Sequence, residues 1–516
     1  MEQNNMFMNQ PQKGELFDTR YGKKDRWFVL IAAALGFLFF ELVFFEGFGI
    51  SMTVWMVVFY AAVFWYLSGK SGGIDRRGLP LLVPIALLSA CYGLYDNMLL
   101  AFLNFLLLIA LVVLQLAAMT GNRLYKTFSM GLLIDLFHGA VALPLMNIPA
   151  PFRALKRRKD GGRKASPIWR IAIGLVISVP LLAVVLVLLA GADPVFERTL
   201  KDVFSYLNDN VLEYVGKVFL SLMAAIPLFG LLWALRHNQR VQALGRKINM
   251  DKARIIDEGI VNTVLVLLNI VYVVFIAIQF GYLFNAFSRI LPDTFTYAEY
   301  ARRGFLELMG VSVINLCVVS ASMLFSRRNG RSTALLKALE SALLVLTLLL
   351  VASAIAKMVM YMDAYGLTLL RVYVSWFLLL LAIVFIAMLV KLHLRKFALT
   401  RFCSVAFIVL FLGLNFTDVD ARVAQYNIDC YRNGKFKTVD VEMFYNLSDS
   451  MIPYAAVLLD DQNPDIAAKM KELLQHRATI VDDHRWQVFS AARETARTTL
   501  VTNDIMYKQR SDRNMD

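Results

Sequence analysis

The sequence predicts an all-α protein, a polytopic bundle of membrane-spanning helices followed by a small helical C-terminal domain. Two observations predict this class. The 516-residue chain is 58% hydrophobic and 18% charged, whereas an ordinary globular protein is about 45–50% apolar. The apolar residues also gather in segments of about 20 residues, the length at which a helix crosses the hydrocarbon core of a bilayer.

Eleven apolar segments are spanning-helix candidates by length and composition. They are residues 27–46, 50–67, 79–95, 98–119, 171–192, 211–235, 259–287, 304–325, 338–360, 372–390 and 402–416. Short hydrophilic loops connect most of them, so the sequence predicts a bundle whose core lies in the membrane.

The charge of the loops alternates along the chain. Residues 153–170 carry eight Lys/Arg against one Asp, and residues 236–254 carry six against one. Residues 326–337 and 391–401 carry four Lys/Arg each and no acidic residue. Because positively charged loops resist translocation, we expect these loops on the cytoplasmic side. The pattern predicts a bacterial plasma-membrane protein with a cytoplasmic N-terminus and an extracytoplasmic C-terminus.

Residues 128–149 form an apolar stretch that does not fit as a span. The stretch contains Asp135, His138 and two prolines, and counting it as a crossing would place the basic residues 153–170 outside. We expect an interfacial or re-entrant element here. Its lipid-facing residues would be Leu132, Leu133, Leu136 and Phe137.

The predicted span boundaries and the charge pattern of the loops divide the chain into five predicted parts. They are a disordered cytoplasmic tail (1–26), a four-span membrane part (27–119), a basic cytoplasmic loop with the interfacial or re-entrant helix (120–170), a seven-span core (171–416) and an extracytoplasmic helical domain (417–516).

The last hundred residues read as soluble amphipathic helices. Apolar residues at helical spacing predict a helix at Asp418–Tyr431, which ends at Asn433-Gly434. Capping residues predict two more, at Ser448–Leu459 and, after Asn463-Pro464, at Ile466–Leu474. We expect a longer helix at Asp483–Leu500. Their apolar faces predict a shared core. It would contain Tyr426, Tyr431, Phe444, Leu458 and Trp486.

Four sequence blocks resemble those of a bacterial multi-pass membrane family catalogued only as a domain of unknown function. The blocks are ADPVF (192–196), YAEYARRGF (297–305) with Asn315 beyond it, YGLTLLR (365–371) and LNFTDVDARVAQYN (414–427). The resemblance covers roughly residues 190–460. It implies a polytopic membrane protein and brings no activity with it.

Ionisable residues that enter the predicted spans are the strongest candidates for a site, because charges in hydrocarbon are costly and usually face protein or water. The candidate cluster at the outer leaflet contains Glu41, Glu46, Glu299, Arg303, Glu307, Lys357, Tyr361, Tyr365 and Arg371. These residues either line a polar cavity that binds a ligand or form salt bridges and interfacial anchors. We expect Glu307 and Lys357 to pair. We expect the polar residues of the seventh span to bond neighbouring helices instead of lining a path; they are Asn262, Asn269, Asn285 and Gln279.

The distribution of charge and a search for motifs narrow the classes of ligand and partner that we expect. The net charge is +14, but residues 417–516 contain 13 Lys/Arg and 16 Asp/Glu, so the positive excess lies in the membrane part. This distribution predicts contacts with anionic lipid headgroups at the cytoplasmic loops, and no nucleic-acid binding. We find no catalytic, metal or cofactor motif, and the sequence favours a protein that is not an enzyme.

Three functions remain open. An envelope sensor or assembly protein, with a possible protein partner at the outer domain, is favoured. A transporter or flippase with an outward-facing polar cavity is the alternative, although it would need a polar path through the membrane midplane. A lipid-linked glycosyltransferase ranks third, because the first predicted outer loop around Glu46 is only a few residues long.

Overall fold

The computed structural model describes most of the chain, and the account below concerns this part alone. The described residues are 21–70, 73–123, 131–155, 188–205, 209–237, 254–287, 305–327, 332–394 and 396–506, with single positions between 178 and 186. Their regular structure is helical, apart from one isolated bridge between Ile256 and Ser326. The predicted all-α class is confirmed.

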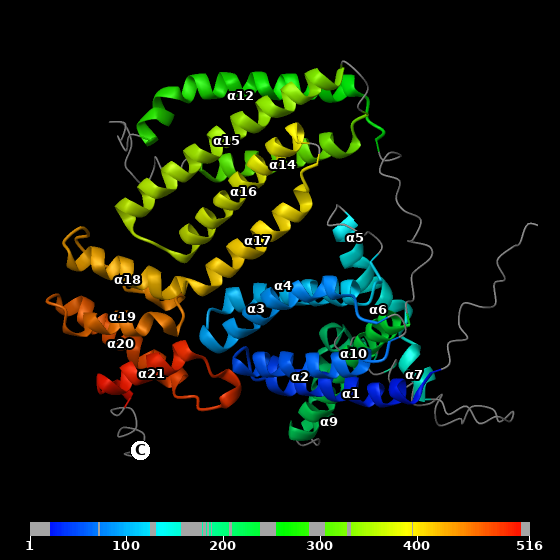
Figure 1. The fold of residues 1–516 in the computed structure, drawn as a ribbon. Helices are drawn as coiled ribbons and strands as arrows, with labels where there is room; N and C mark the ends of the chain where they lie inside the picture. The colour runs from blue at the N-terminus through cyan, green and yellow to red at the C-terminus, as the bar shows by residue number, and fades with distance from the viewer. Residues whose placement is uncertain are drawn as a thin grey trace, which may run out of the picture. The chain divides into compact units, whose positions relative to one another are not determined.

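Ten of the described helices are long and apolar enough to cross a membrane. They are α1 (Lys23–Phe39, continued by a π-helical turn to Phe44), α2 (Ile50–Leu67), α3 (Leu82–Leu94), α4 (Met98–Met119), α10 (Asp209–Arg236), α12 (Glu258–Phe287), α14 (Phe305–Phe325), α15 (Ser332–Tyr365), α16 (Leu369–His393) and α17 (Leu399–Phe416) (Figure 1). Each coincides with a predicted span, so a multi-pass membrane bundle is confirmed. Most of the remaining predicted span, 171–192, lies outside the described residues.

The stretch that was not expected to cross is a broken helix. It consists of α5 (Gly131–Phe137), a π-helical turn and α6 (Leu143–Met146), and is shorter than the spans. Leu133 and Phe137 are exposed while Asp135 and His138 are buried, so its apolar face is turned outward as expected. Its placement relative to a membrane stays a prediction. The shorter helices α7 (Ala150–Leu155) and α9 (Pro194–Ser205) complete this part of the chain.

The chain forms two compact units. The first comprises residues 1–41, 58–73 and 141–237, and its α1 packs along α10. Phe28 is fully buried there, with its ring stacked on Tyr66 at 3.9 Å between centroids. Gly36 allows α1 to approach α10 closely, because a Cβ at that position would lie 2.5 Å from the carbonyl oxygen of Ser221 on α10.

The second unit comprises residues 42–57, 74–140 and 238–516. Its longest helix, α15, packs against α12, α14 and α16 (Figure 1). Leu343, Leu344, Leu350 and Phe385 are almost completely buried in the core of this bundle. The apolar core of the unit therefore surrounds α15.

The chain after Thr417 forms α18 (Val419–Arg432), α19 (Ile452–Ala455), α20 (Pro464–Val481) and α21 (Ala491–Thr502), with short 3-10 turns between them. We call residues 417–506 the C-terminal segment. The predicted cap of α20 at Asn463 is confirmed, whereas Ser448, predicted to cap a helix, makes no capping hydrogen bond with its side chain. Asp418 caps α18. Asp418 accepts a hydrogen bond from the Ala421 N–H at 3.4 Å, and Asn463 accepts one from the Asp465 N–H at 3.0 Å.

Three expectations for this segment need correction. The fourth helix begins at Ala491 instead of Asp483, because Ser490 caps it by accepting a hydrogen bond from the Arg493 N–H at 3.2 Å. The helix expected from Ser448 to Leu459 is broken into 3-10 turns around α19. Trp486 is 49% exposed and lies outside the core, because it stands in the loop before α21. Phe444 and Leu458 are buried as predicted, whereas Tyr426 and Tyr431 are half-buried.

Candidate functional site at the junction of the C-terminal segment

Three turns between helices of the second unit end against the C-terminal segment. They are the turn before α2 (45–49), the turn between α3 and α4 (95–97) and the turn between α15 and α16 (366–368). The segment itself continues from the end of α17, and Figure 1 shows α18 beside the meeting point of α15 and α16. The charge pattern of the loops assigns all of these helix ends to the same side.

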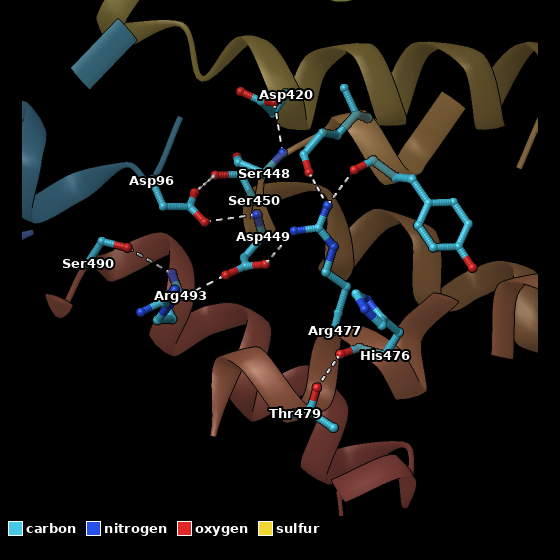
Figure 2. A network of polar contacts seen from close by, with 12 residues as sticks. Asp96, Asp420, Ser448, Asp449, Ser450, His476, Arg477, Thr479, Ser490 and Arg493 are labelled. Carbon is cyan, nitrogen blue, oxygen red and sulfur yellow. Dashed lines mark hydrogen bonds and ion pairs between the residues drawn. The ribbon is translucent and has the colours of Figure 1, made fainter. Parts of the chain in front are cut away.

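The α3–α4 turn reaches the C-terminal segment through two polar side chains. The Asn97 side chain donates hydrogen bonds to the Asp420 carboxylate at 2.5 Å and to the Tyr373 hydroxyl at 3.1 Å. Asp96 accepts from the Asp449 N–H at 2.9 Å and from the Ser450 hydroxyl at 3.3 Å (Figure 2). Two neighbouring residues thus bind two separate parts of the segment.

Asp420 and Asp449 are themselves buried at 1% and 3% exposure. Asp420 accepts a hydrogen bond from the Ser448 N–H at 2.9 Å. The carboxylate of Asp449 lies between the guanidinium groups of Arg477 and Arg493, each at 3.4 Å (Figure 2). A buried carboxylate is costly unless it is paired or hydrogen-bonded. Asp449 is paired with the two arginines, whereas Asp420 accepts hydrogen bonds from the neutral donors Asn97 and Ser448.

The burial changes the acidity of both groups. Desolvation raises the pKa of Asp420 to about 6, although the donors Asn97 and Ser448 favour its charged form. Desolvation and the nearby charge of Asp96 raise the pKa of Asp449. The charges of Arg477 and Arg493 lower it, but by less. We call Asp96, Asn97, Asp420 and Asp449 the carboxylate clamp. Within the described part, no three His, Cys, Asp or Glu side chains are grouped to hold a metal ion.

A second connection joins the segment to the α15–α16 turn. The Asn427 side chain donates to the Leu367 carbonyl and accepts from the Leu367 N–H, both at 2.8 Å. Gly366 adopts a φ of +78°, and a Cβ there would overlap the Asn427 amide oxygen. Two of the sequence blocks, YGLTLLR and LNFTDVDARVAQYN, therefore meet at this contact, and Gly is required because no other residue fits.

A pocket of about 380 Å³ lies beside the clamp. Arg493 lines the pocket and also pairs with Asp449, so the two sites share one side chain. The other lining residues are Ile50, Val481, Asp483, His484, Arg485, Trp486, Phe489, Ser490, Glu494 and Arg497.

The family whose model matches this chain is described as domain of unknown function (DUF4153), and the match covers residues 82–458, more than half of the chain. The chain belongs to this family. No curated protein and no solved structure matches it. The resemblance seen in residues 190–460 is confirmed and extends to the third and fourth spans. The DUF4153 region contains all four residues of the carboxylate clamp, whereas every residue that lines the pocket lies outside it.

The ionisable residues predicted to form a site in this DUF4153 protein occupy several places. Tyr361, Tyr365 and Arg371 do meet, because the Arg371 guanidinium lies 4.0 Å from the Tyr361 ring centroid and donates to the Tyr365 carbonyl at 3.0 Å. Glu46 pairs with Arg485 in the second unit. Each of these contacts ties one loop or helix end to another.

Three further residues of the predicted cluster are Glu41, Glu299 and Arg303. Glu41 pairs with the buried Lys217 of α10 at 2.9 Å, in the first unit. Glu299 and Arg303 lie outside the described residues. Whether any of the predicted residues binds a ligand stays a prediction.

The expected pairing of Glu307 with Lys357 is not formed. Glu307 is exposed near the start of α14, Lys357 is buried in α15, and the described residues show no ion pair between the two. Residue counting placed both charges at a similar depth, but depth does not fix the rotation of a helix about its axis.

The DUF4153 bundle also holds a buried polar chain that sequence reasoning missed. The Tyr272 hydroxyl donates to Asn315 at 2.8 Å, and Asn315 donates to Thr347 at 2.9 Å. The Ser322 hydroxyl donates to the fully buried Glu340 at 2.6 Å. Glu340 is ionisable and lies within a predicted span, which is the signal that could have identified it.

One predicted role of the polar residues in this bundle is confirmed. The Asn269 side chain of α12 donates to the Leu339 carbonyl of α15 at 3.1 Å. It bonds a neighbouring helix, as expected for an amide inside a membrane bundle.

Proposed function

We propose that this protein is an envelope sensor or assembly protein of the bacterial plasma membrane, with its N-terminus in the cytoplasm and its C-terminal segment outside. In this proposal the segment receives a ligand or a protein partner, and the carboxylate clamp passes the change to the spanning helices. The observation that supports it is the attachment of the segment to the α3–α4 turn through Asp96 and Asn97. The basic loops on the cytoplasmic side contact anionic lipid headgroups.

The energetics of the clamp support a coupling role. Asp449 is buried and relies on Arg477 and Arg493 for compensation, while its backbone N–H is held by Asp96. Removing one partner of such a buried set leaves an uncompensated charge, which costs far more than an exposed pair. A ligand that draws Arg493 away from Asp449 therefore affects the α3–α4 turn directly.

Amide hydrogen exchange on the full-length protein in lipid nanodiscs tests this coupling. Arg477→Gln weakens the support of Asp449, so we expect faster exchange both in the C-terminal segment and at residues 95–101. Arg422→Gln is the matched control, because Arg422 is an exposed arginine on α18 whose side chain donates to Gln425 at 3.2 Å and makes no hydrogen bond to the clamp among the described residues. Faster exchange confined to the C-terminal segment would contradict the proposal.

A transporter is the second candidate, and one observation favours it. Tyr272, Asn315 and Thr347 form their buried hydrogen-bonded chain near the middle of α12, α14 and α15, where a transporter has its binding groups. Hydrogen bonds that only hold neighbouring helices together would explain the same contacts. Solute or lipid movement in proteoliposomes that Glu340→Gln abolishes and Arg477→Gln leaves intact would favour transport over the sensor.

A further inference from the structure

The pocket beside the clamp carries three arginines on its walls. Arg493 and Arg497 are four residues apart on α21 and therefore share one face of that helix. Arg485 faces the pocket from the preceding loop. The lining residues include two carboxylates, Asp483 and Glu494. Arg485 is already paired with Asp483 and with Glu46, so Arg493 and Arg497 are the cationic groups that a ligand could reach.

Part of this positive charge is available to a ligand. Arg493 uses its Nε atom to bind Asp449, and its two Nη atoms have no partner among the described residues. Arg497 contacts Glu494 only at 3.9 Å and the His484 ring at 2.9 Å. The pocket also includes Ser490, the N-cap of α21, and the N-terminal end of a helix attracts anions.

The pocket is also continuous with a spanning helix. The Ile50 N–H, at the first residue of α2, donates to the Phe489 carbonyl at 2.9 Å. Ile50, Val54 and Val57 share a face of α2, on which Val54 and Val57 are 41% and 67% exposed. An exposed apolar strip on a span therefore begins at the pocket.

The aromatic side chains agree with a position at the membrane surface. Trp486 and Phe489 are 49% and 40% exposed and both line the pocket. Trp is enriched at headgroup level in membrane proteins because its ring is amphipathic. The cationic pocket and the apolar strip thus match the two ends of a phospholipid.

We propose that this pocket binds the phosphate group of a membrane lipid, with the phosphate on Arg493 and Arg497 and an acyl chain along Val54 and Val57. A volume of about 380 Å³ falls in the range of small-molecule sites, which suits a lipid headgroup better than a bare phosphate ion. The proposal names the ligand of the sensor described above and rests on that function only for the coupling to the clamp. A phosphate that binds the free Nη atoms of Arg493 competes with its pairing to Asp449.

Native mass spectrometry of the full-length protein with dioctanoyl phosphatidic acid tests the site. Dioctanoylglycerol has the same chains without the phosphate, and inorganic phosphate has the anion without the chains. We expect phosphatidic acid to bind at least tenfold more tightly than dioctanoylglycerol, because charge-assisted hydrogen bonds contribute a factor of this order. We expect it to bind at least tenfold more tightly than inorganic phosphate as well, because its acyl chains bury apolar surface. Equal binding of dioctanoylglycerol overturns the phosphate site, and equal binding of inorganic phosphate overturns the lipid assignment.

Two variants locate the binding. Arg497→Gln removes a pocket arginine that does not support the clamp, and Trp486→Ala removes an exposed ring, so either protein should fold. We expect about tenfold weaker phosphatidic acid binding for Arg497→Gln and a smaller loss for Trp486→Ala, with Arg422→Gln unchanged. If both single variants, Arg497→Gln and Trp486→Ala, bind phosphatidic acid with wild-type affinity, the lipid binds elsewhere and the proposal is overturned.

The same samples separate this proposal from the proposed function. Phosphatidic acid that binds the wild type and loosens amide exchange at residues 95–101 supports both. Binding without any change in exchange keeps the lipid site and contradicts the sensor. Absence of binding refutes the site, whatever the exchange of Arg477→Gln shows for the clamp.

Discussion

Single charged residues illustrate what the sequence reveals and what it hides. Glu41 and Lys357 were identifiable because they interrupt apolar spans, and both prove to be in or near a packed interior. Their partners were not identifiable. Lys217 lies far from Glu41 in the sequence, and no periodicity relates α1 to α10. The same holds for Asp449, whose contact with Asp96 joins residues separated by 353 positions.

Asp420 gives the junction a pH dependence of definite sign. Burial raises its pKa from 3.8 to about 6, so between about pH 4 and pH 6 the folded junction binds more protons than the separated segment does. The contribution of Asp420 to stability is therefore greatest below about pH 4, falls as the pH rises to about 6, and is constant above. The pKa values of Asp418 and Asp449 shift in the same direction.

We expect lowering the pH from 7.5 to 4.5 to stabilise the C-terminal segment against local unfolding, with about 2–3 kcal/mol from Asp420. Amide exchange, corrected for the intrinsic effect of pH, measures it. Asp420→Asn should reduce the slope, whereas Asp429→Asn, at an exposed position of the same helix, should leave it unchanged. Greater stability at pH 7.5 than at pH 4.5 would refute the assignment.

Two aromatic residues of the C-terminal segment should respond oppositely to truncation. Phe444 is fully buried and Trp486 is 49% exposed. We expect Phe444→Ala to cost about 3–5 kcal/mol through the cavity it leaves, and Trp486→Ala to cost about 1 kcal/mol or less. Resistance of the segment to limited proteolysis reports the difference. Equal loss in both variants would place Trp486 in the core after all.

At the scale of elements, a polar cap predicted a helix start where proline followed it, at Asn463-Pro464, but not at Ser448, whose side chain makes no capping hydrogen bond. Asp418 and Asn463 each follow a clear break and fix the starts of α18 and α20. The start of α21 was misjudged because apolar residues continue at helical spacing before Ser490, and Arg493 stands where a capping box would have an acidic residue. Tertiary contacts decide this boundary, since Phe489 bonds to Ile50 through its backbone.

The turn between α15 and α16 offers a sharp test at this scale. Gly366 has a φ of +78° and no room for a Cβ beside Asn427, whereas Gly434 has a φ of +72° with open space around it. Gly434→Ala should therefore cost only the backbone strain, about 1 kcal/mol. Gly366→Ala should cost at least about 2 kcal/mol more, because the Asn427 contacts to Leu367 are lost as well.

Thermal unfolding of the purified protein, followed together with proteolysis of the C-terminal segment, compares the two glycine variants. The Gly366→Ala protein should release the segment at a lower temperature than the Gly434→Ala protein. Similar behaviour of the two would mean that Asn427 does not hold the turn.

For the whole molecule, hydropathy predicted the spanning helices and left their grouping open. Each of the ten long apolar helices matches a predicted span, because the length and composition that make a helix able to cross a bilayer can be read from the sequence. Both compact units combine segments that are distant in the sequence: residues 1–41 group with 141–237, and residues 74–140 with 238–516. This grouping depends on side-chain fit, such as Gly36 against Ser221, which no local pattern reveals.

Orientation in the membrane is the largest remaining prediction, and contacts in the second unit make it economical to test. The turns at 95–97 and 366–368 bind the C-terminal segment directly, so one label on the segment fixes the side of both turns. Val457 is 47% exposed on the segment, and Lys396 is exposed in the loop between α16 and α17. The charge pattern assigns these two positions to opposite sides.

In a background without the four native cysteines, a membrane-impermeant maleimide applied to intact spheroplasts should label Val457→Cys. Lys396→Cys should react only after permeabilisation. The physical reason is that its loop is among those with four basic and no acidic residues, which resist transfer across the membrane. Labelling of Lys396→Cys in intact spheroplasts, with protection of Val457→Cys, would invert the second unit, and with it the outer placement of the pocket that the lipid proposal requires.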